Sequence, residues 1–105
     1  MASTTQIQVT AVDNEVYIIA STGAGSSELC HVKSGYNKPV SCTFDPGAIL
    51  APGTYDLTVF GINWGGPGNY AVSAPGTTPA LVNPPTTTAV GVFGAQRVTM
   101  TITGP

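Results

Sequence analysis

Glycine and proline interrupt this chain so often that it cannot form long helices. Thirteen glycines and nine prolines are spread over its 105 residues, and both residue types are unfavourable inside helices. Between them lie short segments rich in Val, Ile, Thr and Tyr, the residues that favour strands. The sequence therefore predicts an all-β fold.

About eight short strands are expected, separated by turn signals such as Asp13-Asn14 and Asp45-Pro46-Gly47. The last segment alternates cleanly between apolar and polar residues, which is typical of a half-buried strand. Regularly spaced short antiparallel strands favour a Greek-key-like β-sandwich, formed as a single domain over residues 1–105. The expected strands cover residues 6–11, 15–20, 29–33, 40–44, 54–62, 70–73, 86–93 and 96–103.

Composition excludes several classes of protein. Hydrophobic residues make up 42% of the chain and charged residues only 8%, which argues against intrinsic disorder. No apolar run is long enough for a membrane-spanning helix. The only basic residues are Lys33, Lys38 and Arg97, too few and too scattered to form a nucleic-acid or anionic-membrane surface.

The two cysteines lie symmetrically about Tyr36. If residues 29–33 and 40–44 form a hairpin around the turn at 34–37, Cys30 faces Cys42 and the apolar side chains share one face. Opposed cysteines of this kind can form a disulfide, and we expect one here. The alternative is a pair of buried thiols that pack as small hydrophobic groups.

No catalytic motif is recognisable. The single histidine, His31, is expected on the polar face of its strand, as an ordinary exposed residue. Nucleophile, metalloprotease and phosphate-loop motifs are absent from the sequence, and its five acidic residues are dispersed. We therefore expect a protein that is not an enzyme.

The only tryptophan lies in a glycine-rich loop. Trp64 is preceded by Asn63 and followed, a few residues later, by Asn69 and Tyr70. An aromatic ring beside neutral amides suits a sugar, because the ring stacks on C–H groups and amides hydrogen-bond hydroxyls. These four residues are the predicted ligand site. The alternative is a tryptophan that folds back over the core, with asparagines that serve the turns.

A second candidate site is the turn Asp13-Asn14-Glu15. Its carboxylate and amide oxygens are suitable calcium ligands, and Asp45 or Asp56 could complete the set. An ordinary hairpin turn explains the same residues more simply. No other cofactor is expected.

Two segments, residues 51–59 (Ala-Pro-Gly-Thr-Tyr-Asp-Leu-Thr-Val) and 68–73 (Gly-Asn-Tyr-Ala-Val-Ser), carry a resemblance to known families. They resemble a pattern shared by bacterial pre-peptidase C-terminal domains and galactose-binding-like sandwiches. The length, low charge and Thr, Asn and Gly content also resemble small soluble bacterial lectins. That resemblance implies sugar binding, often through calcium, in dimers or tetramers. The calcium ligands of those lectins have no residue-by-residue match in this sequence.

The expected function is a lectin-like domain that binds a glycan of neutral sugars as a homo-oligomer. A structural or protein-interaction module of a surface, virion or secretion apparatus is the alternative, as is a small secreted toxin or effector. The first residues lack a basic region followed by an apolar core, so no cleaved signal peptide is expected. Export without a cleaved leader and a cytoplasmic location both remain open.

Overall fold

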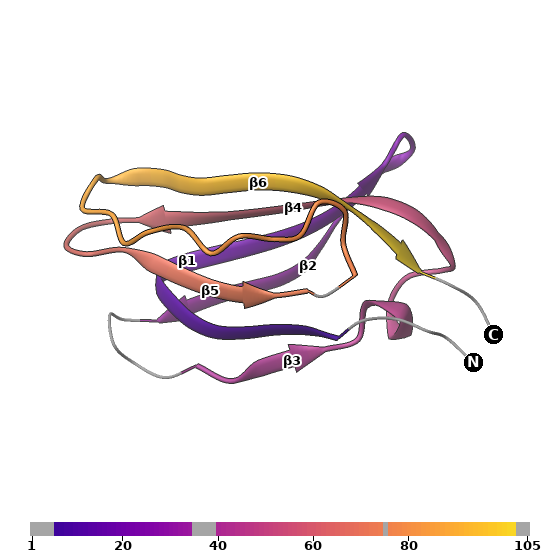
Figure 1. Cartoon of the computed structure of the whole chain (residues 1–105), viewed down its shortest axis with the longest axis horizontal. Coiled ribbons are helices and arrows are strands. Elements are labelled where there is room, and N and C mark those ends of the chain that lie inside the picture. Colours follow the sequence, from indigo (N-terminus) through magenta and orange to yellow (C-terminus); the bar gives the residue numbers. More distant parts are fainter. Residues whose placement is uncertain (1–5, 35–39, 75, 103–105) are drawn as a thin grey trace.

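The computed structural model describes residues 6–34, 40–74 and 76–102, and in this part of the chain the fold is all-β, as predicted (Figure 1). A single 3-10 turn, η1 (Pro46–Ala48), is the one helical element there. The strands are β1 (Ile7–Thr22), β2 (Gly25–Ser34), β3 (Cys42–Phe44), β4 (Gly53–Asn63), β5 (Asn69–Ser73) and β6 (Gly91–Ile102).

Strand β1 organises the molecule because it pairs with four other strands. Its first half, residues 7–13, lies between β3 and β5, and its second half, residues 14–22, lies between β2 and β4. Strand β6 continues the second group beside β4, and every pairing is antiparallel. Figure 1 shows the first half of β1 curving away from the second, so that β3 and β5 lie on one side of the molecule and β4 and β6 on the other. This arrangement is compatible with a Greek-key sandwich.

The core lies between these two groups of strands. Alternation places Leu57 and Val59 of β4 inward, and Val98, Met100 and Ile102 of β6 do the same. This confirms the inward face predicted for the last strand. Each such side chain contributes roughly 1.5 to 3 kcal/mol on full burial. The fully or nearly fully buried hydrophobic residues are Ile7, Val9, Val12, Val16, Ile18, Ala20, Leu57, Val59, Tyr70, Val72, Ala74, Val98, Met100 and Ile102.

Two predicted turns lie within strands, which reduces the expected eight strands to six. Asp13 and Asn14 continue β1, because Asp13 pairs with Asn69 and Asn14 with Ser34 on neighbouring strands. Gly94, in the break predicted between residues 86–93 and 96–103, has a positive φ of 60° inside β6, where the pairing with β4 shifts register between Val59 and Gly61. A register shift of this kind accommodates a residue such as Gly94, which favours turns, inside a strand.

The predicted cysteine hairpin is wrong. Within the described residues β2 and β3 do not pair, because each pairs with a different half of β1: Cys30 lies opposite Ile18, and Cys42 opposite Val9. Strands β2 and β3 therefore each form their backbone hydrogen bonds with β1 and not with each other. Tyr36 and most of the predicted turn lie outside the described residues.

Candidate functional site

The loop after β4 presents Trp64 at the surface while two hydrogen bonds hold it to β1. The Trp64 backbone N–H donates to Asn14 Oδ1 at 2.6 Å, and the indole Nε1–H donates to Glu15 Oε2. The residue is nevertheless 64% exposed. An exposed ring held at both its backbone and its polar edge loses little freedom when a ligand stacks on it.

Glu15 connects Trp64 to β2. Its second oxygen, Oε1, lies 2.7 Å from His31 Nε2, and the Tyr17 hydroxyl donates to the same oxygen at 3.4 Å. The hydrogen bond from Trp64, followed by that from His31, lowers the pKa of Glu15 below its ordinary value of 4.5. An ionised carboxylate only accepts hydrogen bonds, so Nε2 of His31 carries the proton.

Three rings stack across the strands beside this carboxylate. Tyr17 lies between its cross-strand neighbours His31 and Phe60, with ring centroids 4.0 Å and 5.1 Å apart and planes within 12° and 14° of parallel. Stacked rings cover one another's faces, and contacts of this kind stabilise neighbouring strands. Tyr17 is covered on both faces in this stack, whereas Trp64 is 64% exposed.

Asn63, predicted as a ligand residue, is fully buried and shapes the loop. Its side-chain Nδ2 donates to the carbonyl oxygens of Gly66 and Ala89, at 2.9 Å and 3.0 Å, and its Oδ1 accepts from the Gly65 N–H at 3.1 Å. The amide thus forms its hydrogen bonds inside the protein. This matches the turn-forming role that sequence analysis considered as the alternative.

The other two predicted ligand residues lie on β5 and differ in exposure. Tyr70 is in the core, where its hydroxyl donates to the Gly94 carbonyl and accepts from Gln96 Nε2. Burial raises the pKa of Tyr70. Asn69 is half-buried and lies opposite Asp13 in the β1–β5 pairing. Trp64 and Asn69 are thus the predicted ligand residues that retain accessible surface.

The candidate calcium residues form a hydrogen-bonded run instead of a converging set of oxygens. Asn14 Nδ2 donates to Asp13 Oδ1 at 2.7 Å, and both oxygens of Glu15 receive side-chain donors. Asp45 accepts from the Gly47 N–H and begins η1. In the described residues, no three His, Cys, Asp or Glu side chains gather where they could hold a metal ion.

The Glu15–His31–Trp64 cluster could not be predicted from the sequence. The alternation of β1 and β2 was enough to place His31 on a polar face, but only strand pairing brings it beside Glu15. A single sequence contains no local signal for that contact. The cluster unites residues that sequence analysis had treated as three separate features.

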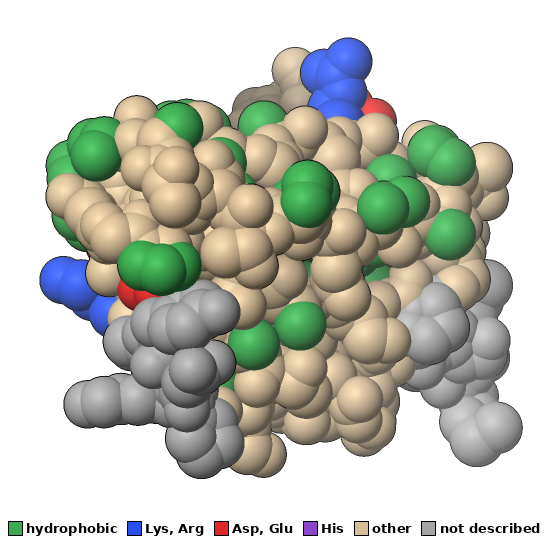
Figure 2. Space-filling view, turned by 60° about the vertical axis from the view of Figure 1, so that its left-hand side comes forward, with side chains coloured by type: hydrophobic (Ala, Val, Ile, Leu, Met, Phe, Trp, Pro, Cys, Tyr) green, Lys and Arg blue, Asp and Glu red, His purple; other side chains and the backbone are tan. Residues whose placement is uncertain are grey.

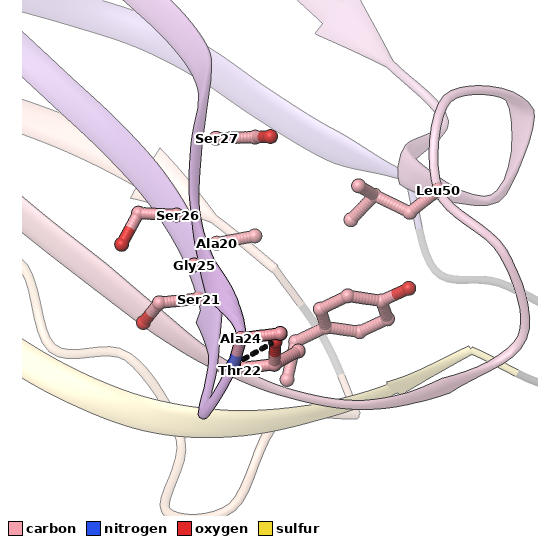
Figure 3. Close-up of a pocket in the computed structure, with 9 residues that line it drawn as sticks. Ala20, Ser21, Thr22, Ala24, Gly25, Ser26, Ser27 and Leu50 are labelled. Carbon is pink, nitrogen blue, oxygen red and sulfur yellow. Dashed lines mark hydrogen bonds between the residues drawn. The ribbon is translucent and has the colours of Figure 1, made fainter.

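The surface and its depressions are mostly uncharged. Figure 2 shows hydrophobic side chains dispersed among neutral polar atoms, with few charged groups in view. A shallow pocket of about 300 Å³ lies between the β1–β2 hairpin and the segment before β4 (Figure 3). Leu50 points into it from one side and Ala20 lies on the other, with the Ser27 hydroxyl nearby (Figure 3), and Tyr55 and Ala24 also line it.

No family model, curated protein or solved structure matches this chain. In the described part of the chain, no helix is long and apolar enough to cross a membrane.

Proposed function

We propose that this protein is a non-catalytic, lectin-like module in which Trp64 is the platform for a neutral sugar of a glycan. The observation that carries the proposal is the combination of exposure and restraint at Trp64. The residue is 64% exposed, yet Asn14 and Glu15 hold its backbone and its indole N–H. Sugar C–H groups stack on such a ring without a large loss of side-chain entropy.

Polar groups beside the ring suit sugar hydroxyls. His31 uses Nε2 for Glu15, and no described residue hydrogen-bonds its other ring nitrogen. Asn69 lies opposite Asp13, the neighbour in sequence of Asn14, which accepts the hydrogen bond from the Trp64 backbone. The low charge of the chain, 8% of residues, favours a neutral ligand over an ionic one. Binding at one such site is weak, so a homo-oligomeric, secreted bacterial lectin would gain affinity through multivalency.

A glycan array followed by titration of the best glycan tests the proposal. Trp64 is the only tryptophan, so its fluorescence reports binding to the wild type, and isothermal titration calorimetry measures the affinity of every variant, including Trp64→Ala, which has no tryptophan. Trp64→Ala should weaken binding about tenfold or more, equivalent to roughly 1.4 kcal/mol. Ile49→Ala is the matched control, because Ile49 is 59% exposed and caps η1, and Figure 1 shows this turn at the end of the molecule opposite to the loop between β4 and β5.

Two results would contradict the proposal. One is the absence of any glycan bound above background, and the other is equal affinity for the wild type, Trp64→Ala and Ile49→Ala. Light scattering on the same samples measures the oligomeric state, and strictly monomeric protein would remove the multivalency argument.

A further inference from the structure

The two cysteines meet although their strands do not pair with each other. Cys30 Sγ and Cys42 Sγ lie 3.9 Å apart, and both are thiols. Cys30 belongs to β2, which pairs with the second half of β1, and Cys42 belongs to β3, which pairs with the first half. The contact therefore joins the two groups of strands between which the core lies.

We propose that Cys30 and Cys42 form an intramolecular disulfide that links the two strand groups. The sulfur atoms must approach from 3.9 Å to about 2.0 Å for this bond. Both cysteines are only half-buried, so a small disulfide oxidant reaches them. This proposal is independent of sugar binding.

The reaction balances with a small disulfide such as oxidised glutathione. One cysteine thiolate attacks a sulfur of the oxidant, forms a mixed disulfide and releases one glutathione thiolate. The second cysteine, as a thiolate, then attacks the protein sulfur of that mixed disulfide and releases the second glutathione. The protein loses two hydrogens, and the oxidant is reduced to two thiols.

The surroundings of Cys30 suit a structural bond better than a fast redox centre. Burial, with a smaller contribution from neighbouring Cys42, raises the pKa of Cys30 to about 12. Its thiol is therefore almost fully protonated at neutral pH and reacts slowly. Oxidation should accelerate as the pH rises.

A disulfide at this position constrains more of the fold than one within a hairpin. A hairpin disulfide would connect strands that already share backbone hydrogen bonds. Here the bond would fasten β3, which has only three residues, to the opposite edge strand β2. The bond would also close a loop between two residues 12 positions apart in the sequence. This restricts the unfolded chain and should raise Tm by about 10 °C.

The test treats the folded, reduced protein with oxidised glutathione at pH 8.5. Intact mass and thiol titration should show loss of both thiols without a retained glutathione, at a rate independent of protein concentration. Cys30→Ser and Cys42→Ser should each stop at a single glutathione adduct, because neither has a second thiol to resolve it. The oxidised wild type should have a higher Tm than the reduced protein.

Three results would overturn the proposal. The first is wild-type protein that keeps both thiols while a urea-unfolded sample oxidises. The second is wild-type protein that stops at glutathione adducts or forms only linked dimers on a non-reducing gel. The third is a fall in Tm on oxidation, which would mean that bond formation distorts the fold. None of these results bears on Trp64, so the failure of this proposal is distinguishable from the failure of sugar binding.

Discussion

At the scale of single residues, the exposed position of Trp64 depends on Glu15, which is 49 positions away in the sequence. The indole N–H of Trp64 and Nε2 of His31 both donate to the carboxylate of Glu15, whose side chain is 8% exposed. Both hydrogen bonds are shorter than the 3.4 Å contact from the Tyr17 hydroxyl. Hydrogen bonds to an ionised acceptor are stronger than those between neutral groups. Glu15 is therefore a positioning residue that holds Trp64 in place.

Replacing Glu15 should destabilise the protein in a pH-dependent way. Because the folded-state pKa of Glu15 is lowered from 4.5, its ionised form stabilises the fold at pH values above the unfolded-state value. That contribution is lost as the pH falls through the folded-state pKa. Glu15→Gln should thus have a lower free energy of unfolding than the wild type at pH 7, and the difference should shrink toward pH 2.

Urea unfolding followed by Trp64 fluorescence from pH 7 to pH 2 measures this difference. Glu28→Gln is the control, because Glu28 is an exposed carboxylate on β2 and should change stability little. A stability difference between Glu15→Gln and the wild type that stays constant down to pH 2 would contradict the assignment.

At the scale of elements, the irregular pairing of β4 with β6 depends on a glycine. A side chain at Gly61 would place its Cβ 2.6 Å from Phe93 Cζ and 3.0 Å from Tyr70 Cδ2. The two rings pack against each other with centroids 5.7 Å apart. The missing side chain lets Phe93 lie across β4, close to where the register shifts between Val59 and Gly61.

Gly61→Ala should therefore destabilise the protein by about 1 to 3 kcal/mol, the usual cost of overfilling a packed site. Gly65→Ala is the matched control, because no atom lies within 4 Å of the added Cβ, and its effect should stay within about 0.5 kcal/mol. Urea denaturation of both variants gives the comparison, and equal stabilities would show that the Phe93 ring moves aside at no cost.

Elements were predicted well where their signal is local and poorly where it depends on a partner. The alternation of residues 96–103 was enough to predict the buried side of β6. Asp13-Asn14 carries a turn signal, yet strands on both sides supply backbone partners and keep β1 continuous. Turn propensity is a weak preference that tertiary pairing overrides.

At the scale of the whole molecule, β1 makes the two groups of strands one cooperative unit. Ile7 in its first half and Ile18 in its second are both buried in the same core. A substitution in either half of β1 should therefore lower the stability of the whole molecule.

Core truncations in the two groups should lower the same unfolding transition. Ile7→Ala in β1 and Leu57→Ala in β4 each remove a fully buried side chain and should cost about 2 to 5 kcal/mol. Far-UV circular dichroism and Trp64 fluorescence should give coincident transitions for both variants. If Ile7→Ala shifted the circular dichroism transition alone, the two groups would be independent.

The sequence by itself determined the all-β class and the inward face of β6, and it pointed to Trp64 as a candidate ligand residue. These properties follow from short-range features: glycine and proline spacing, period-two alternation and the chemistry of single side chains. Only the tertiary structure decided which strands pair, that Cys30 and Cys42 meet from opposite strand groups, and that Glu15 holds Trp64. The physical reason is that these contacts join residues far apart in the chain, and their free energy arises from packing and hydrogen bonds that exist only when the whole fold is assembled.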